Sequence, residues 1–96
     1  MDIAEFQGLM GRIYLERDRR RGVDGTFRWL VEEVGEVARA LRGDDPARLR
    51  HELGDVLAWL SSLANLADVD LSEAAARYAE GCPRCGATPC ACPFPS

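Results

Sequence analysis

Residues 29–60 read WLVEEVGEVARALRGDDPARLRHELGDVLAWL. Apolar residues recur at helical spacing on both sides of a polar turn at residues 43–46. Gly43 predicts the end of the first helix, while Asp45 and Pro46 predict the N-cap and first residue of the second. Because the connection is short, we expect the two helices to run antiparallel as a helical hairpin.

Four carboxylates stand at matched positions on the two arms of this hairpin. Glu33 and Glu36 on the first arm, like Glu52 and Asp55 on the second, are three residues apart and project from one helix face. Two cross-arm pairs follow, Glu36 with Glu52 and Glu33 with Asp55. In both pairs the midpoint of the two residue numbers is the same and falls inside the turn, so each pair should lie at the same height along the hairpin. Since hard cations prefer carboxylate oxygens, this register predicts a Mg²⁺ or Mn²⁺ site. The alternative is a solvated acidic face paired with arginines.

The same register predicts what lies at either end of the carboxylates. Arg48 falls nearest the turn, and Trp29 faces Trp59 at the far end. The tryptophans have two interpretations, either as core aromatics of the bundle or as a surface on which a nucleobase stacks.

The remaining chain up to residue 81 also reads as helical. We expect a helix over residues 2–20 capped by Asp2, a glycine-containing loop, and a helix over 26–42 that begins at Thr26. After the helix that begins at Pro46, a short helix capped by Asp70 should cover residues 71–80. The predicted fold is all-α, a small antiparallel bundle of about four helices forming one domain over residues 1–81.

Residues 82–96 form a separate cysteine-rich tail. All four cysteines of the chain, Cys82, Cys85, Cys90 and Cys92, fall here with the spacing C-x2-C-x4-C-x-C. This spacing favours a structural Zn²⁺ site that resembles a zinc knuckle. Two disulfides and a disordered tail with free thiols are the alternatives.

Composition narrows the function classes further. The chain has 96 residues, 29% of them charged, and a net charge of −4, which argues against a nucleic-acid polymer as partner. No apolar run approaches the ~18 residues that span a bilayer. The start of the chain lacks the pattern of a secretory signal, so we expect a cytoplasmic protein without a membrane partner.

The acidic motifs carry a resemblance to a known family. EEVGE and ELGD, with fifteen residues between them, resemble the EExxE…ExxD signature of the MazG-like nucleotide pyrophosphohydrolases. These belong to the all-α NTP pyrophosphatases, together with dimeric dUTPases and dCTP pyrophosphatases. The segment ERD at residues 16–18 and DVLAWL after the second motif add to the resemblance.

The resemblance implies a reaction and a set of site residues. The reaction is hydrolysis of a nucleoside triphosphate between the α and β phosphates, which gives a monophosphate and pyrophosphate. It implies Mg²⁺ ligands at Glu33, Glu36, Glu52 and Asp55. Glu32 and Glu33 are the candidate catalytic residues, and Glu32 would be a further ligand or orient the attacking water. The candidate substrate-binding residues are Arg17, Trp29, Arg48 and Trp59.

The chain departs from the resemblance in one respect. Members that select dCTP follow ERD with a tryptophan, whereas this chain has Arg19 there. The resemblance therefore does not imply dCTP selectivity for this chain. Members also assemble their sites between subunits, which implies a homodimer or homotetramer.

Two other functions compete with hydrolysis. The first is a non-catalytic metal- or nucleotide-binding helical module whose zinc tail docks a protein partner. The second is a di-iron bundle, which requires Glu-x-x-His pairs. The single histidine, His51, has Arg48 three residues before it, so we interpret it as a helix-surface residue.

Overall fold

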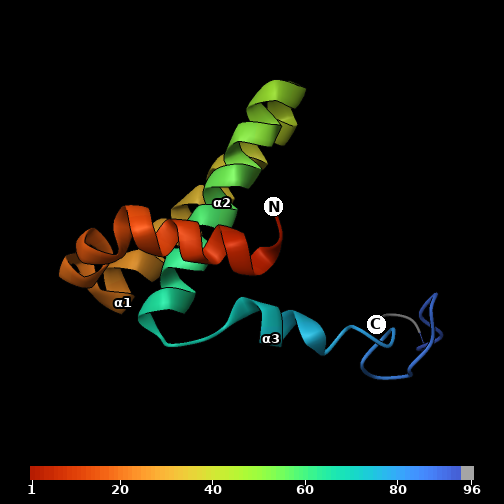
Figure 1. Ribbon diagram of the computed structural model, residues 1–96. Coiled ribbons are helices and arrows are strands. Elements are labelled where there is room, and N and C mark those ends of the chain that lie inside the picture. The colour runs from red at the N-terminus through yellow and green to blue at the C-terminus, as the bar shows by residue number, and fades with distance from the viewer. Residues whose placement is uncertain (94–96) are drawn as a thin grey trace.

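The computed structural model describes residues 1–93 and confirms an all-α chain (Figure 1). It contains two long helices, α1 (Ile3–Gly43) and α2 (Pro46–Leu66), and one short helix, α3 (Leu71–Ala76). The sequence predicted about four helices. The count differs because the first two predicted helices are merged into α1.

Helix α1 begins with the expected cap. The Asp2 carboxylate accepts a hydrogen bond from the Glu5 amide at 2.8 Å, and the Glu5 carboxylate accepts one from the Asp2 amide at 3.2 Å. This reciprocal capping box satisfies two amides that have no partner within the helix.

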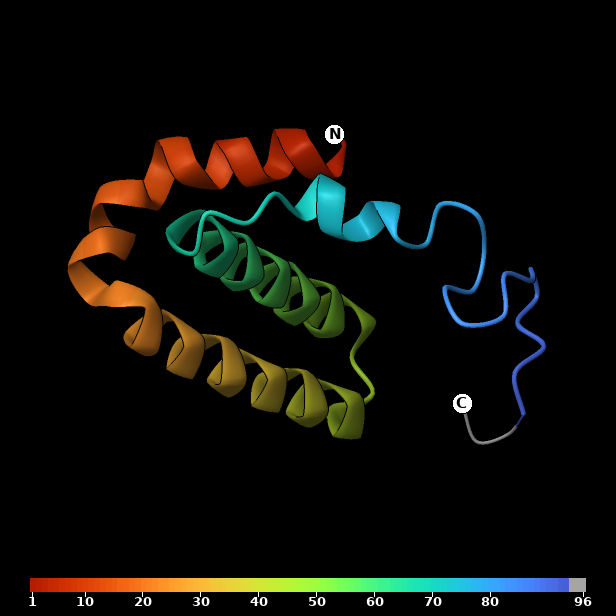
Figure 2. The same cartoon turned by 90° about the horizontal axis from the view of Figure 1, so that it is seen from below.

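The predicted loop between residues 20 and 26 is wrong. Only Gly22 leaves the helical region within α1, with φ 85° and ψ 169°. The arginines before it favour helix, and the glycine concentrates the bend at one residue because it tolerates positive φ. Figure 2 shows the outcome, in which α1 folds back around one end of α2.

Thr26 is therefore not a helix N-cap. Its side chain is fully buried, and its hydroxyl accepts a hydrogen bond from Arg21 Nη1 at 3.3 Å. Thr26 thus connects the two segments of α1 across the bend.

The hairpin turn follows the prediction with one change. Asp45 accepts hydrogen bonds from the amides of Ala47 and Arg48, and Pro46 is the first residue of α2, as expected. The left-handed position that ends α1 is taken by Asp44, with φ 52°, rather than by Gly43. Short polar side chains tolerate this conformation better than most.

Helix α3 is shorter than predicted and lies against the start of α1. Asp70 caps it through the amides of Ser72 and Glu73, but the helix ends at Ala76 rather than Glu80. The side chain of Gln7 donates to the Val69 carbonyl at 2.7 Å and accepts from the Leu71 amide at 2.8 Å. These two bonds join the N-terminal segment of α1 to α3.

The buried apolar core is small. Among the described residues, the buried apolar side chains are only Met10, Ala40 and Ala64. Val34 and Leu41, two of the apolar residues that recur at helical spacing on the first arm of the hairpin, are 53% and 61% exposed. One chain therefore leaves much of its apolar helical surface uncovered.

Across residues 1–93, no helix is both long and apolar enough to cross a membrane. After α3 the chain runs into the cysteine tail, which extends away from the helical hairpin in both views (Figures 1 and 2). Residues 94–96 of the predicted tail unit lie outside the described residues.

Candidate active site

The four predicted metal ligands lie on the facing arms of the helical hairpin. Glu33 and Glu36 project from the second segment of α1, and Glu52 and Asp55 from α2. Glu52 is 7% exposed, and the other three carboxylates are half-buried.

Glu33 has an electrostatic environment that disfavours its charge. Burial raises its pKa above the usual 4.5, and the negative charges of Asp55, Glu52 and Glu36 and a hydrogen bond with Glu52 raise it further. The other three predicted ligands thus all act on Glu33. A cation bound among them would remove this repulsion, so the donor set fits a hard divalent ion.

Arg48 spans the two arms at the turn end of this cluster. Its Nη2 lies 3.5 Å from Glu36 Oε2, and its Nε lies 3.9 Å from Glu52 Oε1. Arg48 therefore partly neutralises the carboxylates nearest the turn, on the side where the sequence register placed it.

His51 lies closer to the carboxylates than the sequence indicated. Its Nε2 is 3.3 Å from Asp55 Oδ2, and His51, Glu52 and Asp55 each have a ligand atom within 4.8 Å of the others. His51 is exposed, as expected for a helix-surface residue, but the i, i+4 spacing brings it beside Asp55.

Trp29 and Trp59 face each other, as the register predicted. Their ring centroids are 5.6 Å apart and the rings are inclined by 11°, a stacked arrangement. The guanidinium carbon of Arg21 lies 4.6 Å from the Trp59 ring centroid. The stack therefore joins α1 to α2, and the guanidinium of Arg21 extends it.

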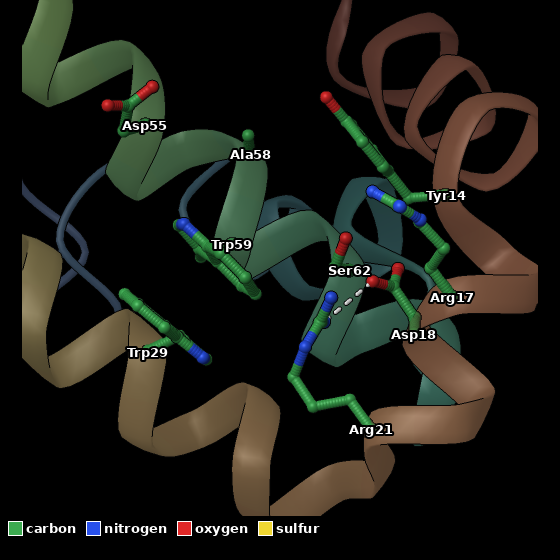
Figure 3. Close-up of a pocket in the computed structure, with 9 residues that line it drawn as sticks. All are labelled: Tyr14, Arg17, Asp18, Arg21, Trp29, Asp55, Ala58, Trp59 and Ser62. Atoms are coloured by element: carbon green, nitrogen blue, oxygen red, sulfur yellow. Dashed lines mark hydrogen bonds and ion pairs between the residues drawn. The ribbon is translucent and has the colours of Figure 1, made fainter.

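A pocket of about 370 Å³ opens beside this stack (Figure 3). It lies between the N-terminal segment of α1, the region around Trp29 and the face of α2 from Asp55 onwards. The residues that line it are Tyr14, Arg17, Asp18, Arg21, Trp29, Asp55, Ala58, Trp59 and Ser62. Asp55 belongs to both the pocket and the carboxylate cluster, so the two are continuous.

Of the predicted substrate-binding residues, Arg17 and both tryptophans line this pocket, whereas Arg48 lies at the carboxylate cluster. Glu32 is exposed on α1 next to Glu33. The predicted residues thus occupy two adjoining zones, one acidic and one aromatic.

The sequence reasoning missed Asp18 and Arg21 as pocket residues. Asp18 is 1% exposed, and its Oδ1 accepts a hydrogen bond from Arg21 at 2.9 Å. Its Oδ2 is buried without a hydrogen-bond partner among the described residues. The membership of Asp18 in ERD was the available signal, but the position of Arg21 depends on the bend at Gly22.

The four cysteines form a second cluster in the tail. Hydrogen bonds from the amides of Ala91 and Ala87 lower the pKa of Cys85 to about 6. The neighbouring thiols of Cys90 and Cys82 raise the pKa of Cys92 to about 12. The four sulfur atoms lie within 4.8 Å of one another and provide a ligand set for a metal ion.

A family comparison agrees with this geometry. Residues 21–84 match the model of the MazG nucleotide pyrophosphohydrolase domain. The chain belongs to the MazG family. The matched MazG segment contains all four carboxylates and both tryptophans, and it ends before Cys85.

A curated relative supports the assignment. The MazG chain is 43% identical over 60 residues to a protein of cyanophage S-2L named dATP/dGTP diphosphohydrolase. The alignment covers 62% of this chain and 51% of the relative. This chain thus spans about half the length of the curated relative it matches.

Proposed function

We propose that this MazG domain hydrolyses nucleoside triphosphates between the α and β phosphates, in the presence of Mg²⁺ or Mn²⁺. The products would be a nucleoside monophosphate and pyrophosphate, and the role would be the removal of particular nucleotides from the pool. The observation that carries this proposal is the repulsion that Asp55, Glu52 and Glu36 exert on Glu33, beside a pocket lined by stacked tryptophans.

In this proposal the carboxylates bind the metal ion. Glu33, Glu36, Glu52 and Asp55 would hold the cation, and Glu32 would add a ligand or orient water from its exposed position next to Glu33. The cation, when bound, would supply Lewis-acid stabilisation of charge on the phosphates and a more acidic water. Arg48 contacts Glu36 and Glu52 in the structure. We propose that it transfers its contacts to the departing pyrophosphate, for which its forked guanidinium is suited.

In this proposal the aromatic zone around the two tryptophans binds the nucleobase. Trp29 and Trp59 line the same pocket as Asp55, so a nucleotide with its phosphates at the carboxylates would extend its base toward them. Arg17 lines the same pocket and would contact phosphate or sugar. The free Oδ2 of Asp18 would accept a hydrogen bond from an amino group of the base.

Purine deoxynucleotides are the first substrates to test. The relative's name assigns it dATP and dGTP, and both bases carry an exocyclic amino group that would donate a hydrogen bond to Asp18. The absence of a tryptophan at Arg19 gives no reason to prefer dCTP.

We also propose that the active form is a homodimer or homotetramer. The chain exposes 7154 Å², whereas a folded monomer of its mass exposes about 5,500 Å². Part of the excess belongs to the extended tail. The remainder includes exposed apolar side chains on both long helices, among them Val31, Val34, Leu53 and Leu57. A second copy that covers them would complete the small core.

A nucleotide panel tests the proposed reaction. Purified protein with Mg²⁺ is incubated with each NTP and dNTP, and pyrophosphate and orthophosphate are measured separately. Pyrophosphate release that disappears in Glu36→Gln and Asp55→Asn, but persists in the exposed control Glu16→Gln, supports the proposal. If calorimetry detects bound Mg²⁺ but no nucleotide is hydrolysed, a non-catalytic binding module replaces it.

A further inference from the structure

The cysteine tail lies mostly outside the segment that matches the MazG model. That segment ends at residue 84, so Cys85, Cys90 and Cys92 follow it. The nucleotide chemistry proposed for the hairpin uses none of these residues. The tail therefore needs an explanation of its own.

The four sulfur atoms have the spacing of a tetrahedral thiolate site. Cys82 Sγ lies 3.7 Å from Cys92 Sγ and 3.6 Å from Cys90 Sγ, and all four sulfurs lie within 4.8 Å of one another. Zinc–sulfur bonds of about 2.3 Å place the corners of a regular tetrahedron about 3.8 Å apart. The observed separations are within a few tenths of an ångström of that value. All four cysteines are free rather than disulfide-bonded.

The backbone around the cluster is arranged for thiolates. The Ala91 amide donates to Cys85 Sγ at 3.3 Å, and the Cys92 amide donates to Cys90 Sγ at 3.4 Å. Gly86 follows the Cys-x-x-Cys turn with φ 76°, a conformation that glycine adopts without strain. Amide donors stabilise a charged thiolate more than a neutral thiol. The thiolate is the form that binds a metal.

The tail has little else to hold it in this shape. Its described residues are mostly exposed, and two backbone hydrogen bonds close the loop, from the Cys82 amide to the Ala87 carbonyl and from the Gly86 amide to the Cys82 carbonyl. Two hydrogen bonds do not offset the conformational entropy lost when eleven residues adopt one conformation. A bound ion that joins four side chains would offset it.

We propose that Cys82, Cys85, Cys90 and Cys92 bind one Zn²⁺ ion in a closed, structural tetrahedral site. Soft thiolates select zinc over the hard ions suited to the hairpin carboxylates. Four protein ligands leave no open position for water or substrate, so this ion orders the tail and takes no part in hydrolysis. The two metal sites of the chain thus differ in ligand chemistry and in role.

Gly81 provides a variant that keeps every ligand. Its φ is 109°, and a Cβ at this position would lie 2.7 Å from Thr88 Oγ1 and 3.0 Å from the Gly86 carbonyl oxygen. Gly81→Ala should therefore distort the loop and weaken zinc binding at least tenfold without removing a sulfur. Gly43→Ala is the matched control, because a Cβ there meets no neighbouring atom within 4 Å.

The experiment measures metal content and affinity in the full chain. Protein purified under reducing conditions should contain one zinc per chain by elemental analysis. Cys90→Ser and Cys92→Ser should each lose it, Gly81→Ala should lose zinc to a chromogenic chelator at lower chelator concentration, and Gly43→Ala should match the parent. Cobalt substitution should give the absorption bands of a tetrahedral tetrathiolate site.

Metal-free protein with four thiols that react freely, in spite of added zinc, would overturn the proposal. So would a mass decrease of four hydrogens in freshly reduced and refolded protein, because that mass indicates two disulfides. Zinc content is measured without nucleotide, so the result is independent of the hydrolase proposal.

Discussion

The two tryptophans allow a direct test of whether the aromatic stack binds a nucleobase or only joins two helices. We consider Trp29→Ala. Trp29 is 46% exposed, and the contact it loses is one stacked partner at 5.6 Å. Such a pair contributes about 0.5–1.5 kcal/mol to folding beyond the apolar area that it buries. At roughly 4–8 °C per kcal/mol for a domain of this size, loss of the stacking alone should lower the melting temperature by about 2–12 °C.

The expected effect on nucleotide binding is larger. A base that stacks on an aromatic side chain gains about 1–3 kcal/mol. Since ~1.4 kcal/mol is a factor of ten, Trp29→Ala should weaken nucleotide binding by about 5- to 150-fold. Both tryptophans of the chain belong to the stack, so tryptophan fluorescence, excited selectively over tyrosine, reports on it alone. In the variant Trp59 remains as the reporter, and titration with a non-hydrolysable nucleotide gives the dissociation constant.

Tyr78→Ala is the control, because this exposed aromatic contacts Arg77 outside the pocket. It should leave nucleotide affinity unchanged. If Trp29→Ala lowers the melting temperature while nucleotide affinity stays within twofold of the parent, the stack is a structural element and the proposed base site is wrong.

Three further predictions concern the charged groups. Because the pKa of Glu33 is raised, the protein without added metal should lose stability as pH rises from 4.5 through that raised value. In thermal melts, Glu33→Gln should flatten this decrease. The same variant should also reduce the stabilisation of the fold by added Mg²⁺. Arg48→Met should strengthen Mg²⁺ binding by up to about fivefold in calorimetry, since exposed ion pairs contribute about 0.2–1 kcal/mol. The same variant should lower kcat. Weaker Mg²⁺ binding would contradict this role of Arg48. Asp18→Asn should lower kcat/KM for dATP and dGTP about tenfold or more relative to dTTP. The reason is that a buried hydrogen bond to a charged group contributes about 1.5–3 kcal/mol. Equal losses for all bases would indicate a purely structural role for Asp18.

The hairpin was determined by the sequence itself. The signals are local, since Asp45 and Pro46 set the start of α2 and the matched spacing on each arm sets the register. A turn of fixed length between two helices leaves little freedom in how they pair, so the facing of Trp29 and Trp59 could be derived from residue numbers. The same motifs supplied the family resemblance.

The tertiary structure decided how the rest of the chain meets this hairpin. The bend at Gly22 could not be distinguished from a loop, because arginines and glycines are compatible with both. It brings the N-terminal segment of α1 back over α2, and this packing buries Asp18 and Thr26 and places Arg21 on Trp59. The contact between Arg21 and Trp59, which are 59 − 21 = 38 positions apart, depends on the backbone angles of one glycine, which local periodicity does not encode. The hairpin thus follows from sequence spacing, whereas the pocket beside it exists only in the folded chain.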